Sequence, residues 1–402
     1  MALAAAVPAG LLVSPDTVLY GVQPHAVYDF IGRLFLNALM MLVIPLIASS
    51  VIHALGAASE GFGRIGARMV AFYLTSGLFA VLGGLLFVNL FRPGIADGIP
   101  ARDRIGLSPL SPEFARGIAE RGASDLWGIL QRLVPDNVFA AAARGEILAL
   151  LTFAVLYGLL VSRLPPAVAA PQRAFWEGVN SVMIGMTRWV MFFAPLGVFA
   201  LVARSLSASG LQAFGPLLGF FFTVLAALAT HLFVTLPLLL WIWTRRNPWR
   251  HLRAMSEALA LGFTTSSSAA TLPKTLECLE RRAGVPRRVA GFVASIGTTV
   301  NMDGTALYEC AAALFIAQCY GLELTFGVQF TVVALALISS VGVAGIPSAS
   351  LVAIALILTA VGLPLEGLGL ILAVDRLLDM CRTAVNVYGD ACAATAAAHG
   401  ET

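Results

Sequence analysis

Charged residues are scarce in this sequence. Only 12% of the 402 residues are Asp, Glu, Lys or Arg, while 59% are hydrophobic and the mean hydropathy is +0.88. Soluble domains carry roughly a quarter charged residues, so this composition excludes an ordinary soluble fold. A bilayer core is crossed by ~20 apolar residues of helix, and charge-free runs of at least that size recur at 34–59, 69–91, 205–244 and 324–365. We therefore expect a multi-pass protein of the cell membrane, surrounded by lipid.

The motifs of several enzyme and pump classes are also absent. The sequence has no GxxxxGK[ST] phosphate loop, no HExxH and no Cys/His cluster, which argues against ATP-driven pumping and metalloproteolysis. Its five cysteines form no CxxC pair and are read as free thiols, and its five histidines are scattered and read as structural or interfacial. The net charge is only +3, with basic residues between apolar runs, which disfavours nucleic-acid binding. No nucleophile and base converge, so we expect neither an enzyme nor an organic cofactor.

The first half reads as a chain of apolar helices. We expect a short helix at 1–14 and longer helices near 28–55, 65–91, 126–163, 175–206 and 212–244. Arginines cluster in alternate loops, near 64–68, 163–173 and 245–253, which the positive-inside rule places in the cytoplasm. The polar stretch 92–125 then lies on the other side. Residues 1–14 are too short to span, so the first helix is truncated or unusually short.

The second half predicts two re-entrant hairpins. Residues 324–365 carry no charge, yet their centre is the Gly/Ser/Pro-rich segment SSVGVAGIPSAS, which suits two short helices meeting inside the membrane. The second tip is TTSSSAATLP, at 264–273, and it lies between the basic clusters 245–253 and 281–288. Two hairpins that open from opposite faces are typical of secondary transporters with inverted repeats, whose binding site is at mid-membrane.

Between the hairpins, an apolar segment is interrupted by the polar run from Asn301 to Thr305. Asn, Asp and Gly together favour an unwound helix. An uncompensated Asp at this depth costs about 2.5–3.5 kcal/mol on insertion scales, and a hard cation ringed by oxygens would be a natural partner for Asp303. The alternative is a structural kink in which Asp303 is only hydrogen-bonded.

The last helix carries a polar stripe. Its members, at spacings of 4, 3, 4 and 4 residues, fall on one face: Asp375, Asp379, Arg382, Asn386 and Asp390. A guanidinium pairs bidentately with a carboxylate, and an aspartate one turn away suits an ammonium group. Arg382 and Asp379 therefore fit a zwitterion that carries an additional carboxylate. Alternatively, the two side chains neutralise each other.

Four motifs resemble those of the sodium-coupled glutamate and aspartate transporter family, which includes the archaeal aspartate transporters and the animal excitatory amino-acid transporters. They are TSSSAATLP, NMDGTALYE, AGIPSAS and DMCRTAVNVYGD, and they occur in the family's order over nearly the whole chain. The resemblance implies an all-α elevator-type transporter with inverted repeats, eight transmembrane helices and two hairpins, assembled as a homotrimer. Residues 1–252 would form a six-helix half that is mainly trimerisation scaffold, with helices near 65–91 and 212–244 joining the transport core of 253–402.

The resemblance also implies the binding residues. The substrate set is Ser266, Ser267, Ser268, Thr305, Ile346, Pro347, Ser348, Ala349, Ser350, Asp379, Arg382, Thr383 and Asn386. Two or three sodium ions would be held by Thr75, Ser76, Asn301 and Asp303, by Gly297, Asn301, Asn386 and Asp390, and by Thr299, Met302 and Ser340, with Phe72, Val341 and Val343 beside them. In the family the arginine binds the side-chain carboxylate and the aspartate binds the amine. Where the family usually has another arginine, this chain has Ser266 and Met380.

Glu309 follows the broken segment, where burial disfavours the charged form of a carboxyl group. The animal transporters have their proton acceptor at this place in the motif, so the resemblance implies a proton carrier; the alternative is a neutral acid that only hydrogen-bonds. We expect a symporter that moves L-aspartate or L-glutamate into the cell on the sodium gradient, with protons as a candidate second ion. A proton-coupled dicarboxylate carrier and an anion channel on the same scaffold are the alternatives.

Overall fold

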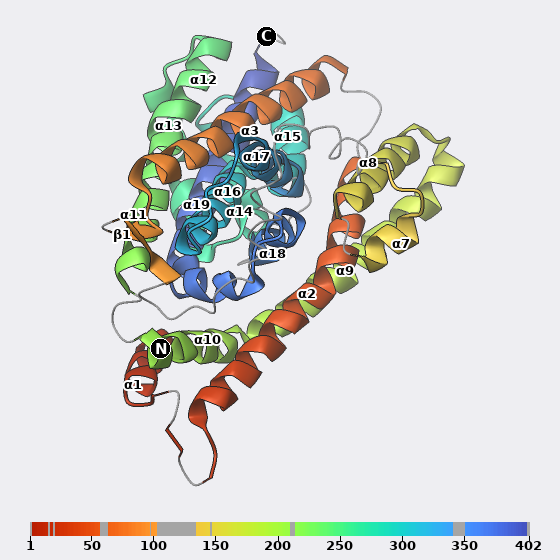
Figure 1. Cartoon of the computed structure of the whole chain (residues 1–402). Helices are drawn as coiled ribbons and strands as arrows, with labels where there is room; N and C mark the ends of the chain where they lie inside the picture. Colours follow the sequence, from red (N-terminus) through yellow and green to blue (C-terminus); the bar gives the residue numbers. More distant parts are fainter. Residues whose placement is uncertain are drawn as a thin grey trace.

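The structure is a computed structural model, and it is built almost wholly of helices (Figure 1). It describes residues 2–14, 17–18, 21–56, 63–96, 98–102, 134–144, 147–209, 214–340 and 350–399. The helices of the first half are α1 (Ala2–Leu11), α2 (Pro24–Gly56), α3 (Gly63–Phe91), α7 (Val138–Ala143), α8 (Ile147–Arg163), α9 (Pro166–Phe192) and α10 (Ala194–Ser209). After α3, the two-residue strands β1 (Ile95–Ala96) and β2 (Ile99–Pro100) pair antiparallel.

The second half is a series of short helices that ends in one long one. In order they are α11 (Phe214–Thr230), the π-helix η2 (His231–Thr235), α12 (Leu236–Thr244), α13 (Pro248–Thr265), α14 (Ser268–Arg281), α15 (Arg287–Val300), α16 (Asp303–Cys319), α17 (Phe326–Ser340), α18 (Ser350–Val361), the 3-10 turn η3 (Leu365–Gly367) and α19 (Leu368–Ala398). We call α13 and α14 hairpin 1, and α17 and α18 the arms of hairpin 2.

The helices fall into two groups. In one, α2 packs against α8, α9 and α10, and α1 packs against α10; Figure 1 shows α2 running beside α9. The groups meet where α2 contacts α18 and α10 contacts α19. In the other group, α3 and α11 pack against α16 and α19, together with the helices of the second half. The long α19 contacts most members of this second group, and so its polar face lies at the centre of the molecule.

Local sequence explains where the functional helices break. Hairpin 1 turns at Ser266, which ends α13 in the left-handed conformation (φ 51°), and at Ser267, whose hydroxyl caps α14 by accepting from the amide of Ala270 at 3.2 Å. Between α15 and α16, Asn301 (φ −107°, ψ 91°) and Met302 (φ −120°, ψ 59°) are both non-helical. The predicted unwinding at 301–305 is therefore confirmed, although helix resumes already at Asp303.

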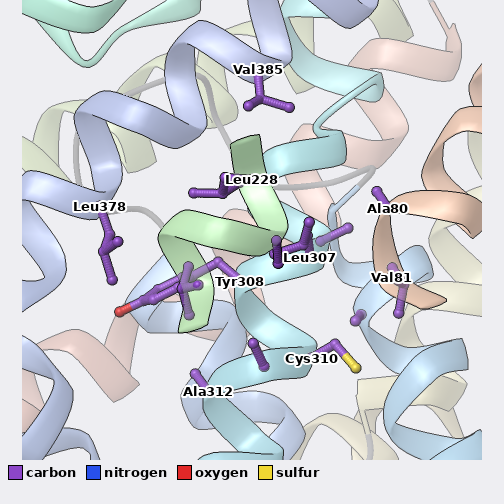
Figure 2. Close-up of a cluster of buried hydrophobic side chains, with 14 of the residues drawn as sticks. Ala80, Val81, Leu228, Leu307, Tyr308, Cys310, Ala312, Leu378 and Val385 are labelled. Carbon is purple, nitrogen blue, oxygen red and sulfur yellow. The ribbon is translucent and has the colours of Figure 1, made fainter. Parts of the chain in front are cut away.

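Small residues bring the core helices close together. A Cβ on Gly84 of α3 would lie 2.6 Å from the carbonyl oxygen of Leu307, and one on Gly304 of α16 would lie 2.7 Å from that of Arg382. Such close backbone approach is how helices pack where no hydrophobic effect drives them together. Figure 2 shows the apolar filling between these helices, with Ala80 and Val81 from α3, Leu228 from α11, Leu307 and Cys310 from α16, and Leu378 and Val385 from α19.

Among the described residues, two helical segments are long and apolar enough to span a membrane by themselves, Gly63–Phe91 and Gly215–Thr244. A third would be Pro166–Phe192 with Ala194–Arg204, which are bent by 50° where Pro195 follows the break. The predicted helix at 175–206 thus starts earlier and is bent. Of the helix predicted at 126–163, residues 126–133 and 145–146 lie outside the described residues, and the rest contains α7 and α8. The hairpin arms, of 12 to 18 residues, are too short or, in α13, too polar to span a membrane by themselves.

Candidate substrate and cation sites

Two clusters of buried polar side chains lie along α19. The five residues of its stripe are all in the interior, with exposures of 2% for Asp375, 7% for Asp379, 1% for Arg382, 4% for Asn386 and 1% for Asp390. Burying so many polar groups is costly unless they are paired or serve a ligand. The stripe divides into a part around Arg382 and, nearer the C-terminal end of α19, a part around Asp390.

We call Arg382, Asp375, Asp379 and Tyr308 the arginine cluster. The Arg382 Nη2 donates to Asp379 Oδ1 at 2.8 Å and to Asp375 Oδ1 at 3.1 Å, and its guanidinium carbon lies 3.9 Å from the centroid of the Tyr308 ring. The alternative in which Arg382 and Asp379 neutralise each other is therefore present in the structure. However, Arg382 Nε and Nη1 have no partner among the described residues, so the fork still has N–H groups for a ligand carboxylate.

Other predicted substrate residues adjoin this cluster. The Thr383 hydroxyl donates to the carbonyl of Asp379 at 2.8 Å, and Asn386 Nδ2 donates to Thr305 Oγ1 at 3.1 Å. Hairpin 1 comes close as well, because a Cβ on Gly262 would lie 3.6 Å from the Thr383 methyl group. At its tip Ser266 and Ser268 are buried, as is Ser350 at the start of α18. The predicted contacts Ile346, Pro347, Ser348 and Ala349 lie outside the described residues.

We call Asn301, Asp303, Asp390 and His231 the cation cluster. Asn301 Nδ2 donates to Asp390 Oδ1 at 3.1 Å, while Asn301 Oδ1 has no partner among the residues described. His231 Nε2 lies 3.3 Å from Asp303 Oδ2. Gly389 lets α19 approach the break between α15 and α16 closely, since a Cβ there would be 3.1 Å from Asp303 Oδ2 and 3.0 Å from Asn301 Nδ2. Two buried carboxyl groups and the side-chain amide of Asn301 thus lie together where α19 crosses the unwound segment.

The other predicted cation ligands come from four helices. On α3, Phe72 and Ser76 are buried, and a Cβ on the adjacent Gly77 would lie 3.6 Å from Asp303 Oδ1. The Thr75 hydroxyl instead donates to the carbonyl of Ala71 on its own helix. The hydroxyls of Thr299 and Ser340 also donate to carbonyls of their own helices, those of Ile296 and Leu337. The Met302 sulfur lies 3.9 Å from Thr305 Oγ1. Gly297 lies against Asp390 and Tyr73. Val341 and Val343 lie outside the described residues.

The donor set suits a hard monovalent cation better than a transition metal. Within the described ranges no three His, Cys, Asp or Glu side chains are arranged so that they could hold a metal ion by themselves. Carboxylate, amide, hydroxyl and backbone oxygens are the ligands that hard cations prefer, and imidazole and thiolate are those of zinc and copper.

His231 was missed as a site residue by the sequence reasoning. It is 2% exposed, and it lies at the start of η2, a π-helical turn of the kind that often marks functional positions. A lone ionisable side chain in the apolar run 212–244 was the available signal, because such residues inside a membrane are expensive and usually functional. Its contact gives a polar partner to Asp303, a predicted cation ligand.

Glu309 follows Tyr308 on α16 but belongs to neither cluster. It is fully buried on α16, and its Oε2 accepts a hydrogen bond of 2.7 Å from Ser339 Oγ on α17. Its other oxygen, Oε1, has no partner in the described part of the chain. The carboxyl group is therefore placed between the broken helix and the first arm of hairpin 2.

The hairpin, the unwound segment and the two polar clusters together are features of a membrane transporter. A family model described as the sodium:dicarboxylate symporter family matches residues 1–399, and the chain belongs to that family. The proton/sodium-glutamate symport protein of Bacillus subtilis is 35% identical over 369 residues, covering 90% of this chain and 84% of that protein.

Two further relatives show the range of the family. The proton/glutamate-aspartate symporter of Escherichia coli is 32% identical over 364 residues, which are 90% of this chain and 82% of its own. The neutral amino acid transporter B(0) of Mus musculus is 34% identical over 407 residues, which cover 90% of this chain and 72% of that transporter. Because similar identity accompanies different substrates in these names, the substrate must be argued from the site.

Proposed function

We propose that this protein is a secondary active symporter that carries acidic amino acids, L-aspartate or L-glutamate, into the cell on the sodium gradient. The observation that supports it most is the placement of Arg382 and Asp379 on one buried face of α19, with part of the guanidinium unpartnered among the described residues. The names of the bacterial relatives, which specify glutamate or glutamate and aspartate, agree with it.

The two side chains select for different parts of the substrate. Arg382 would bind the side-chain carboxylate in a forked geometry, while Tyr308 holds the guanidinium plane from the other side. Asp379 would bind the ammonium group. Since Asp375 also contacts Arg382, it can keep the guanidinium in place while Asp379 turns to the substrate.

Asp379 argues against the rival substrate class. A dicarboxylate such as succinate has no ammonium group, so it would bring a carboxylate close to Asp379 with no compensating charge. Like charges in a buried site cost far more than at a surface because the effective dielectric constant is low. An acidic amino acid avoids this repulsion.

The cation cluster supports sodium coupling. Asp303 and Asp390 are buried, and neither forms an ion pair with Lys or Arg in the described part of the chain. Two carboxylates held this close are stabilised by a cation between or beside them, whose oxygen ligands would include Asn301. We propose two or three sodium ions as cargo, and Glu309 as the carrier of a co-transported proton.

The arrangement of the helices supports an elevator-type mechanism. The group containing α3 and α11–α19 would be the moving transport domain, and α1, α2 and α8–α10 would be the scaffold at which three copies meet. Many large apolar side chains of α2, α8 and α9 are exposed in the single chain, among them Phe30, Leu34, Leu160 and Phe192, and would be covered by lipid or by a second copy.

Uptake of labelled L-aspartate into proteoliposomes tests the proposed function. With an inward sodium gradient we expect accumulation above the external concentration, and with equal sodium on both sides we expect only equilibration. An excess of L-malate should compete poorly, because it lacks the amine that Asp379 would bind. Accumulation of malate, or flux of aspartate that never exceeds equilibrium, would replace this proposal with the dicarboxylate carrier or the channel.

A pH-sensitive dye inside the vesicles tests the role of Glu309. We expect wild-type net uptake to acidify the lumen, and Glu309→Gln to lose both this acidification and the pH dependence of net uptake while still exchanging internal for external aspartate. The exposed Glu323→Gln is the matched control and should behave as wild type. Absence of proton movement in the wild type would make Glu309 a structural residue.

A further inference from the structure

Ser339 joins the first arm of hairpin 2 to the buried carboxyl group of Glu309. Its hydroxyl lies 2.7 Å from Glu309 Oε2 and 3.3 Å from the carbonyl oxygen of Ala336, one turn earlier on α17. The two side chains are 1% and 0% exposed, so water does not compete for either group. One hydroxyl thus faces two acceptors, of which one can change its protonation state.

A hydroxyl in this position can satisfy both forms of the carboxyl group. When Glu309 is ionised, Ser339 Oγ donates its hydrogen to Oε2. When Oε2 carries a proton, Oε2 donates to Ser339 Oγ, and the serine hydrogen turns to the Ala336 carbonyl. A serine hydroxyl can donate one hydrogen bond while accepting another, so neither state leaves Glu309 Oε2 or Ser339 Oγ without a partner and no helix has to move.

We propose that Ser339 is the positioning residue that lets Glu309 gain and lose its proton while the first arm of hairpin 2 stays docked on α16. This inference rests on the proposed function, in which Glu309 carries a proton. The residue that follows Ser339 is the predicted sodium ligand Ser340, at which α17 ends. A single hydrogen bond would therefore connect proton loading with the arm that leads to the substrate and sodium contacts.

Few other groups act on Glu309. Arg382 of α19 is the charged side chain close enough to influence it, and the adjacent Cys310 on α16 is the neighbouring thiol. The sequences of α11, α17 and α18, which also pack on α16, contain no Asp, Glu, His, Lys or Arg. In α3 the ionisable residues, Arg64, Arg68 and Tyr73, precede Gly84, which contacts Leu307. A change at Ser339 should therefore be read directly in the proton step.

The test is the dependence of net aspartate uptake on external pH in proteoliposomes. Alkaline external pH reduces uptake because the carrier is no longer loaded with its proton. Without the serine donor the ionised form is less stable, so in Ser339→Ala the protonated form should persist and the half-maximal pH should move upward by about one unit. Ser339→Thr keeps the hydroxyl and should restore the wild-type profile. Ser339→Cys, a weaker donor, should lie between them.

Three measurements keep this result specific. Net uptake is divided by aspartate exchange in the same vesicles, so that a loss of folded protein cancels. Thr331→Ala on the same helix, whose hydroxyl bonds only Gly327 among the described residues, should not shift the profile. In a Glu309→Gln background, Ser339→Ala should have no effect on pH dependence.

The outcomes separate the two proposals. If the wild type moves protons but Ser339→Ala and Ser339→Cys both keep its half-maximal pH, the role of Ser339 is wrong and proton coupling stands. If the wild type moves no proton, both the proton role of Glu309 and the inference drawn from it fail.

Discussion

The arginine cluster and the cation cluster lie about two turns apart on the same helix, yet they balance charge in opposite ways. In the first, one guanidinium donates to two carboxylates at 2.8 and 3.1 Å, so both carboxylates have a cationic partner within the protein. In the second, Asp303 and Asp390 have an imidazole and an amide as their closest polar partners among the described residues. No Lys or Arg forms an ion pair with them there.

This difference indicates how the two sites depend on each other. The arginine cluster is held by ion pairs within the protein, whereas the two carboxyl groups of the cation cluster have no Lys or Arg partner in the described part of the chain. Both clusters are tied to the start of α16, because Asn386 bonds Gly304 and Thr305 between them. Binding of sodium should thus order the unwound segment first, and the substrate would then find Thr305 and Arg382 already in place.

The largest effect should come from the charge that the substrate needs most. We expect Arg382→Cys to weaken L-aspartate binding by about two to three orders of magnitude, because the buried partner of the side-chain carboxylate is gone. Asp379 remains for the amine, so small neutral amino acids should now bind. Titration calorimetry of the purified protein at saturating sodium measures both. Arg376→Cys is the matched control. This arginine also lies near Asp379, 3.8 Å from its Oδ2, but it is exposed, so its loss should change aspartate affinity little.

An unchanged aspartate affinity in Arg382→Cys would show that the arginine cluster is structural. Folding must be checked separately, because the substitution leaves Asp375 and Asp379 without their shared partner. Retained sodium binding in the variant provides that check, since the cation cluster does not include Arg382.

An intermediate effect should follow from the cation cluster. In Asp390→Asn a carboxylate becomes a neutral amide, so we expect the sodium concentration for half-maximal aspartate binding to rise by at least about tenfold. Aspartate affinity at saturating sodium should change much less. The control is Asp136→Asn, a side chain that is 86% exposed. A sodium titration that coincides with that of the wild type would show that Asp390 is not a ligand of the cation.

The sequence alone predicted what depends on local geometry. The spacing of Asp379, Arg382 and Asn386 fixes them on one helical face, and the run from Asn301 to Thr305 predicts unwinding because its residues favour non-helical backbone. The structure bears out both the buried face and the break. The family also followed from these motifs, and its model matches nearly the whole chain.

Contacts between distant helices could not be predicted in this way. His231 meets Asp303 across 72 positions and Ser339 meets Glu309 across 30, and both contacts depend on how packed helices are rotated against one another. No periodicity in a single segment encodes that rotation. The bend after Phe192 was likewise missed, because the predicted helix at 175–206 was read through Pro195 as one continuous apolar run.

The smallest effect should come from shifting a cation ligand without removing it. A Cβ at Gly297 would overlap Asp390 Oδ1 and come within 2.8 Å of the Tyr73 hydroxyl, so in Gly297→Ala the carboxyl group must move. We expect sodium binding to weaken a few-fold, with a loss of about 1–3 kcal/mol in stability from overpacking. Substrate binding at saturating sodium should be nearly normal, because the arginine cluster lies two turns away.

Gly291 on the same helix provides the matched control for this substitution. A Cβ there meets nothing within 4 Å, so Gly291→Ala should leave sodium binding unchanged and should stabilise α15 by up to about 1 kcal/mol through helix propensity. The two variants therefore make the same chemical change and should shift thermal unfolding in opposite directions. Sodium titrations of Gly297→Ala and Gly291→Ala that superimpose would mean that α15 can yield at this point, and that the position of Asp390 does not set the affinity of the cation cluster.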